Sequence, residues 1–187
     1  MRVAFITVDL QNDFIDRQLI LPKAHLVIQR TNRAIKKAHE LSWDIIHCRS
    51  KVKKKSTEWP PHWQRNLTPK CVEHTAGFDF PNSLNTKIKH KLFYKKYYDI
   101  FEDKQLERYL KQKKITDIII GGLYMHACVF ISCVSAYSKG FRVHLASDLV
   151  ATNNQKFSRE SAKWLKKRIH SYLPFNKIQK AIINNTL

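Results

Sequence analysis

The amino-acid sequence predicts a doubly wound α/β domain, a three-layer fold in which helices cover both faces of a mostly parallel sheet. Short runs of β-branched and other apolar residues alternate along the chain with amphipathic segments of helical period. The apolar runs are nearly continuous, as expected for strands that are buried on both faces. A helical segment separates successive strands, so each connection can return over the sheet as a right-handed crossover.

The elements follow in a regular order. The chain opens with a β-α-β unit, made of a strand at 3–8, a helix within 22–41 and a strand at 43–48. After an irregular stretch the alternation resumes. Its members are a strand at 91–94, a helix at 103–114, a strand at 117–122, an apolar helix near 126–139 and a strand at 141–147. The tail after about residue 153 is expected to hold a last helix and one further terminal element.

Residues 49–83 break this rhythm. They hold the prolines at 60, 61, 69 and 81 and show no sustained period, which predicts a long loop. Such a loop inside a compact domain is unusual unless it covers a site, and WPPHW at 59–63 offers aromatic surface for a pocket wall. The alternative is a disordered insertion.

Length and composition predict a single domain over residues 1–187, because 43% hydrophobic residues can form a sizeable core. The longest apolar runs are far shorter than the roughly 20 residues that span a bilayer. The opening MRVAFITVDLQNDF carries carboxylates rather than a cleavable apolar signal. We therefore expect a soluble cytoplasmic protein. Its cysteines, at 48, 71, 128 and 133, show no CxxC pairing, which favours reduced thiols.

The net charge of +19 raises the question of a nucleic-acid partner, because phosphate contacts supply most non-specific affinity. The lysines are scattered, however, over runs such as KVKKK at 51–55 and KWLKKR at 163–168. Solvated faces are the favoured interpretation, and no signature of a nucleic-acid-binding motif accompanies them. Nucleic acid thus stays an alternative partner that is not favoured.

Reactive side chains stand at or just after the ends of three predicted strands. Asp9 ends the first strand, Lys95 and Lys96 follow the strand at 91–94, and Cys128 follows the strand that ends in Gly121 and Gly122. In an open parallel sheet the strand-to-helix loops converge at the carboxyl ends, where ligands bind. Each residue alone has an ordinary structural interpretation, as a turn cap, a surface lysine or a buried thiol. Their coincidence at one edge favours function.

These residue types suit nucleophilic catalysis. A cysteine in the first turn of a helix meets the positive end of the helix dipole, and a nearby ammonium adds to it, so both favour the thiolate. Asp9 could take the thiol proton, and the glycines could turn amide groups toward an oxyanion. A rival arrangement pairs Cys128 with His126 or His74.

Four segments, taken in order and spacing, resemble the isochorismatase-like cysteine hydrolases, the superfamily of nicotinamidases, ureidoacrylate amidases and carbamoyl-sarcosine amidases. The similarity runs from Val3 to about Asn153. The segments are VDLQNDF at 8–14, CVEHTAGF at 71–78, YKKYYDIF at 94–101 and GGLYMHACV at 121–129, the last followed by AYSKG at 136–140.

The resemblance implies an isochorismatase-like fold and an Asp9-Lys95-Cys128 catalytic triad. It selects Lys95 over Lys96 because Lys95 lies six residues before Phe101, the spacing that the family shows. It also implies a cis peptide bond before Tyr124, and oxyanion donors from the backbone N–H groups of Tyr124 and Cys128.

The sequence departs from the nicotinamidases at their metal site. Those enzymes carry an Asp-x-His pair after the second strand, whereas this strand ends in Cys48, Arg49 and Ser50, and Lys70 replaces a further ligand histidine. His47 and His62 remain, but two scattered histidines are more often structural. We therefore expect no metal or other cofactor, which argues against nicotinamide as the substrate.

The sequence thus predicts a hydrolase that cleaves a C–N bond of a small amide or carbamoyl compound through a thioester on Cys128. From charge alone, Arg49 could bind a substrate carboxylate. The expected pocket residues are Phe14, Trp59, Trp63 and Tyr124. A homo-oligomer is expected from the resemblance. The alternatives are an isochorismatase-type vinyl ether hydrolase and a catalytically idle basic binding protein of the same fold.

Overall fold

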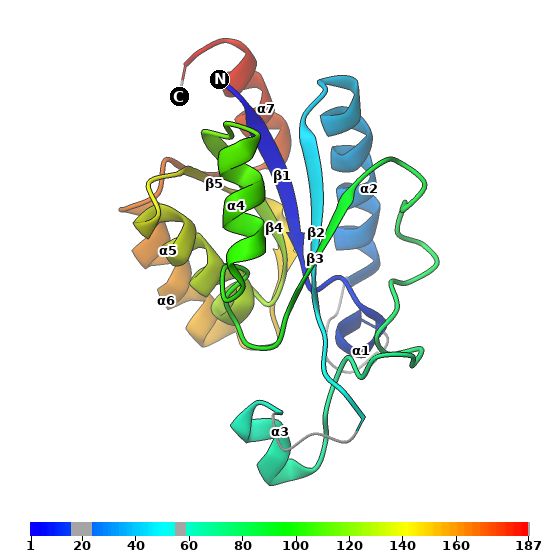
Figure 1. Ribbon diagram of the computed structural model, residues 1–187. Coiled ribbons are helices and arrows are strands. Elements are labelled where there is room, and N and C mark those ends of the chain that lie inside the picture. The colour runs from blue at the N-terminus through cyan, green and yellow to red at the C-terminus, as the bar shows by residue number, and fades with distance from the viewer. Residues whose placement is uncertain (16–23, 55–58, 187) are drawn as a thin grey trace.

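The computed structural model describes residues 1–15, 24–54 and 59–186. Within them the chain forms a six-stranded sheet in the order β3-β2-β1-β4-β5-β6, with every neighbouring pair parallel (Figure 1). This confirms the predicted doubly wound α/β fold. The strands are β1 (Val3–Val8), β2 (Asp44–Ser50), β3 (Lys91–Lys95), β4 (Asp117–Leu123), β5 (Arg142–Ala151) and β6 (Ser171–Leu173).

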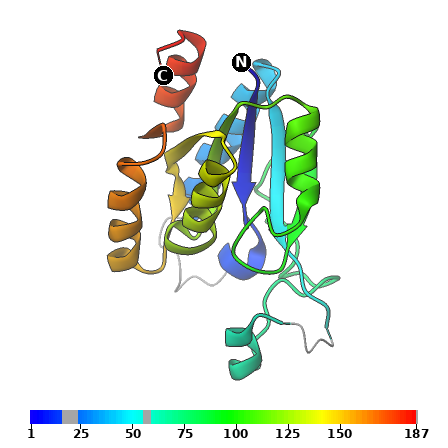
Figure 2. The same cartoon turned by 60° about the vertical axis from the view of Figure 1, so that its left-hand side comes forward.

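Helices cover both faces of the sheet or lie beyond its carboxyl edge (Figures 1 and 2). They are α1 (Asn12–Ile15), α2 (Ala24–Glu40), α3 (Pro61–Asn66), α4 (Lys104–Gln112), α5 (Phe130–Ser138), α6 (Gln155–Lys166) and α7 (Phe175–Ile183). A π-helical turn, Met125–Val129, leads directly into α5. The start of the predicted 22–41 helix, at residues 22 and 23, lies outside the described residues. The tail after residue 153 contains both a helix and, in β6 and α7, two further elements.

The core consists of two apolar layers, one on each face of the sheet (Figures 1 and 2). On one face α4, α5 and α6 bury side chains such as Leu110, Cys133 and Leu165. On the other face α2 and α7 bury Ile35 and Ile178. No helix in the described ranges combines the length and the apolar character needed to cross a bilayer.

The predicted 49–83 loop is partly ordered into secondary structure. Strand β2 continues to Ser50, Val52 pairs with Val72 in an isolated parallel bridge, and α3 begins at Pro61. Helix α3 projects beyond the carboxyl ends of the strands (Figures 1 and 2). The prolines of this stretch predicted a loop and not a helix. Pro61 is nevertheless compatible with α3, because it occupies the first turn, where a missing backbone N–H costs nothing.

The two adjacent glycines lie inside β4, near its carboxyl end, in agreement with the predicted strand at 117–122. Gly122 has a φ of +126°, and a Cβ built there would lie 2.1 Å from the carbonyl oxygen of Val8. A Cβ at Gly121 would lie 2.9 Å from Cβ of Leu149. The glycines therefore allow β4 to approach β1 and β5 closely at the carboxyl edge of the sheet.

We expect Gly122→Ala to lower the free energy of unfolding by about 3 kcal/mol or more, through backbone strain and collision together. Gly140→Ala is the matched control, because Gly140 also has a positive φ, +83°, but has open space around it. Strain alone should cost the control about 1 kcal/mol. Urea unfolding of both variants measures the difference, and equal losses would contradict the close approach of β4 to β1.

Candidate active site

The predicted catalytic side chains come from three segments that end at the same edge of the sheet. Asp9 directly follows β1, Lys95 is the last residue of β3, and Cys128 lies on the π-helical turn that follows β4. Because all the strands are parallel, their carboxyl ends meet at one edge, and the order β3-β2-β1-β4 keeps these segments close. Turns of the π type are frequent at functional sites.

The three side chains are in contact. Lys95 Nζ lies 2.7 Å from Asp9 Oδ2 and 3.4 Å from Cys128 Sγ. The Asp9 carboxylate also acts on the Cys128 thiol and raises its pKa. All three residues are buried, with 1% of Asp9, 3% of Lys95 and 8% of Cys128 exposed. A carboxylate, an ammonium and a thiol that are far apart in the chain therefore share one enclosed space.

Ser50, at the end of β2, completes this cluster and was not singled out from the sequence. Its hydroxyl donates to Asp9 Oδ1 at 2.9 Å and accepts from Lys95 Nζ at 3.0 Å. Lys95 Nζ also donates to the carbonyl oxygen of Tyr97 at 2.9 Å. Lys95 Nζ thus has three oxygen atoms within 3.0 Å, those of Asp9, Ser50 and Tyr97. Ser50 could have been proposed as a site residue on the same ground as Asp9, because both stand at the carboxyl end of a strand.

The electrostatics of the cluster favour a neutral thiol at rest. Burial raises the pKa of Cys128, the Asp9 carboxylate raises it further, and the Lys95 ammonium only partly opposes them. This differs from the expectation that the helix dipole and the ammonium make a resting thiolate. Burial alone would lower the pKa of Lys95, but Asp9 and Cys128 raise it above its ordinary value. Lys95 is therefore a cation across the physiological range.

The backbone around Asp9 is held in an unusual conformation. Asp9 has a φ of 56°, in the left-handed region that few residues other than glycine adopt, and its N–H donates to the carbonyl oxygen of Cys48 at 2.9 Å. Gln11, which is fully buried, then bonds both backbone groups of Ser50, accepting from its N–H at 2.8 Å and donating to its carbonyl at 2.9 Å. Gln11 therefore joins the ends of β1 and β2, a role that the sequence gave no sign of.

The turn that carries Cys128 begins with the Leu123–Tyr124 peptide bond, which is cis, as the resemblance implies. The carbonyl oxygen of Tyr124 accepts hydrogen bonds from the N–H groups of Ala127, at 3.0 Å, and Val129, at 3.2 Å. These bonds close the turn around Cys128.

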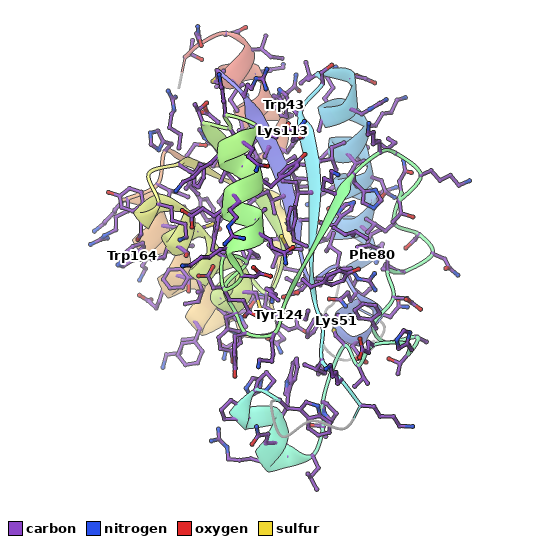
Figure 3. All side chains as sticks on the ribbon, in the orientation of Figure 1. Trp43, Lys51, Phe80, Lys113, Tyr124 and Trp164 are labelled. Carbon is purple, nitrogen blue, oxygen red and sulfur yellow. The ribbon has the colours of Figure 1, made fainter. Side chains whose placement is uncertain are left out.

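A cavity of about 400 Å³ opens onto Cys128. Of the pocket residues expected from the sequence, Phe14, Trp63 and Tyr124 line it, and Tyr124 lies between the sheet and α3 (Figure 3). Asp9 and Lys95 are not among the described residues of its wall. The other lining residues are Ser50, Pro60, Pro61, His62, Asn66, Thr68, Lys70, Lys96, Tyr97, Tyr98, His126, Ala127 and Asn153.

Arg49 and Trp59 lie elsewhere, outside the described lining of the cavity. The Arg49 guanidinium lies between two rings, 3.8 Å from the centroid of Phe78 and 4.5 Å from that of Phe80, and donates to the carbonyl oxygen of Phe78. The Trp59 indole donates to the carbonyl oxygen of Lys53 at 2.8 Å. Both side chains therefore take part in the packing of the long loop.

The residues at the metal position of nicotinamidases do not fit a metal ion here. No group of three or more His, Cys, Asp and Glu side chains suited to a metal occurs in the part of the chain that the structure describes. His47 is fully buried and its Nδ1 lies 2.5 Å from Thr7 Oγ1. Burial, His90 and Arg49 lower the pKa of His47 to about 3. His62 lies apart from it in the wall of the cavity, stacked on Tyr98.

Comparison with known proteins identifies the family to which the chain belongs. Residues 3–171 match the isochorismatase domain. A curated relative, the uncharacterized isochorismatase family protein PncA of Bacillus subtilis (strain 168), is 26% identical over 165 residues, which cover 83% of this chain and 90% of the relative.

Two solved structures share the fold. The nicotinamidase/pyrazinamidase PncA from Bacillus subtilis has a TM-score of 0.83 and 21% identity, with 93% of this chain and 100% of that chain covered. The N-carbamoylsarcosine amidase from Thermoplasma acidophilum has a TM-score of 0.78 and 16% identity, with 93% and 96% covered. The match to the domain over residues 3–171 shows that the chain belongs to the isochorismatase family of hydrolases.

Proposed function

We propose that this protein hydrolyses a C–N bond in a small amide or carbamoyl compound through a thioester on Cys128. The observation that carries the proposal is that Lys95 Nζ contacts both Asp9 Oδ2 and Cys128 Sγ, with Cys128 in the lining of a cavity. The arrangement has a nucleophile, a carboxylate that can serve as its base and an ammonium that contacts both of them, which suits nucleophilic catalysis. Two structural neighbours named as amidases support an amide substrate.

In the first half-reaction the Cys128 sulfur attacks the carbonyl carbon while its proton passes to Asp9. The raised thiol pKa means that this proton leaves during the attack and not before it. The oxyanion is proposed to accept hydrogen bonds from the backbone N–H groups of Tyr124 and Cys128. When the C–N bond breaks, the leaving amine takes the proton from Asp9.

Lys95 keeps its positive charge throughout these steps. Its ammonium stabilises the Asp9 carboxylate in the resting enzyme and lies close enough to Cys128 to stabilise developing charge on the sulfur. Phe14, Trp63 and Tyr124 are proposed to form the wall against which the substrate packs. Water then hydrolyses the thioester and releases the acid.

A panel of small primary amides and carbamoyl compounds tests the proposal, with release of ammonia as the measurement. We expect turnover of at least one compound, and protection of Cys128 from alkylation by that compound. Absence of turnover across the panel, together with a Cys128 that no thiol reagent modifies in the folded protein, would contradict the proposed reaction.

A further inference from the structure

A second cavity, of about 320 Å³, lies between α2, α7 and the last part of β5, and it shares no described lining residue with the cavity at Cys128. Both helices cover the same face of the sheet, where they bury apolar side chains. The volume falls at the lower end of the range found for small-molecule sites. The space therefore suits a compact ligand, and the steps proposed for Cys128 make no use of it.

An irregularity of β5 helps to form this second cavity. The pairing of β5 with β4 is regular up to Leu145, and it resumes only at Val150, so β5 carries extra residues between these two positions. Asp148 and Leu149 belong to this interruption, and both line the cavity. Bulged strands redirect side chains and are over-represented beside functional sites. The cavity is therefore a feature of the backbone path as well as of the surface side chains.

The wall that α2 contributes is strongly cationic. Arg30, Arg33 and Lys37 line the cavity, and their spacing of three and four residues places them on one side of the helix. Among the described lining residues the only carboxylate belongs to Asp148, and its Oδ1 already accepts a hydrogen bond from the backbone N–H of Phe175 at 2.7 Å. The lining therefore carries an excess of positive charge.

This charge is only weakly neutralised by the protein itself. Neither Arg30 nor Arg33 forms an ion pair with any residue that the structure describes, and Arg30 Nη1 donates only to the backbone carbonyl oxygen of Asp148, at 3.4 Å. Lys37 pairs with Glu40 at 3.0 Å, but both side chains are nearly half exposed, so solvent weakens the pair. Cations three and four residues apart on a helix repel each other. A bound anion would relieve this repulsion.

The rest of the lining supplies apolar contacts and neutral donors. Ala34, Leu149 and Phe175 are buried apolar residues of the lining. Asn176 and Gln179 add side-chain amides from α7. An amide nitrogen can donate a hydrogen bond to an anion without adding charge. A ligand that matches this lining has a small apolar body and a compact group with more than one negative charge.

We propose that this second cavity binds a small phosphate monoester. Such a group carries a charge of about −1.5 to −2 at pH 7 and three strong acceptor oxygens. Arg30 and Arg33 bind the phosphate oxygens, since guanidinium groups match phosphate in a bidentate manner. Lys37 balances the remaining charge, and the organic part of the ligand packs against Phe175. A phosphodiester of a nucleic-acid backbone has one negative charge per phosphate and matches the three cations less well.

Isothermal titration calorimetry with phenyl phosphate, at constant ionic strength, tests the proposal. This probe joins an apolar ring to a phosphate monoester, and we expect the wild type to bind one equivalent. Arg33→Gln should weaken binding by about 10-fold, because one charge-assisted hydrogen-bonding group is lost. The double variant Arg30→Gln with Arg33→Gln should show no measurable binding. Lys36→Gln, an exposed position of α2 outside the described lining, is the matched control and should bind as the wild type.

Two further measurements separate a binding role of the arginines from a structural one. Phenyl phosphate should raise the Tm of the wild type but not that of the double variant. Without ligand, Arg33→Gln should melt no lower than the wild type, because it removes the repulsion between Arg33 and the cations of α2 on either side. Benzenesulfonate, a monoanion of similar shape, should bind the wild type more weakly than phenyl phosphate does.

Several outcomes would overturn the phosphate site. They are no binding of phenyl phosphate by the wild type, equal affinities of the wild type and the double variant, and a loss in Lys36→Gln as large as that in Arg33→Gln. An oligonucleotide without terminal phosphates that binds more tightly than phenyl phosphate, and loses its affinity in the double variant, would reassign the cavity to nucleic acid. Cys128→Ala should bind phenyl phosphate as the wild type does, so this test is independent of the proposed hydrolysis.

Discussion

Replacing Cys128 with alanine is expected to abolish hydrolysis, with kcat falling by a factor on the order of 10⁴ or more, because no other group can form the thioester. The fold should survive. Cys128 is a small residue at the edge of the core, 8% exposed, so its truncation should cost only about 1 kcal/mol of unfolding free energy. Ammonia release from an amide substrate measures the activity, and circular dichroism with urea unfolding measures the fold.

Cys133→Ala is the matched control for this substitution. Cys133 lies in α5 and is fully buried, and burial alone raises its pKa, without a contribution from Asp9 or Lys95. The control should therefore lose stability but keep its activity. Equal activity in the wild type and Cys128→Ala would rule out covalent catalysis by this sulfur.

The second large effect concerns the buried ion pair. Lys95→Met keeps the length of the side chain but leaves the Asp9 carboxylate enclosed without its ammonium partner. Breaking a buried pair in this way should cost about 3–5 kcal/mol of unfolding free energy. Activity should also be lost, because Asp9 without its cation becomes protonated more readily and no longer accepts the thiol proton.

Two further variants make this prediction specific. Lys91→Met, an exposed position on the same strand, should change the unfolding free energy by no more than about 0.5 kcal/mol. The double variant Asp9→Asn with Lys95→Met should be more stable than Lys95→Met alone, because it removes the uncompensated charge. A double variant no more stable than Lys95→Met would show that the loss comes from packing and not from charge.

The pH dependence of this pair follows from the Lys95 pKa. Because the folded protein raises this pKa above its ordinary value, the stabilisation by protonated Lys95 is fully present below the unfolded value and is lost only as the pH rises through the folded one. Across neutral pH, protonation of Lys95 itself should therefore not change the stability of the wild type.

The sequence was informative where the chain is regular. Near-continuous apolar strands separated by helices specify a parallel sheet, and a parallel sheet gathers its strand ends at one edge. That is why the side chains of Asp9, Lys95 and Cys128 could be expected together before any distance was known. Family motifs narrowed the choice between Lys95 and Lys96, which strand periodicity alone left open.

Side-chain direction in irregular segments could not be read in the same way. Ser50 and Gln11 act through hydrogen bonds whose partners lie 39 to 45 residues away, and no periodicity reports such pairs. Arg49 was matched to a substrate by charge alone, yet its guanidinium packs against Phe78 and Phe80. The glycine pair was correctly placed at the end of a strand, but local sequence did not reveal how closely β1 and β5 approach it.

Peptide mapping by mass spectrometry, after rapid quenching of the protein with an amide that it turns over, tests the central claim most directly. We expect the acyl part of the amide to appear on the peptide that carries Cys128, to disappear as the amide is consumed, and to be absent from Cys128→Ala. Release of ammonia by Cys128→Ala at the wild-type rate, with Cys128 unmodified at every quench time in the wild type, would contradict the account.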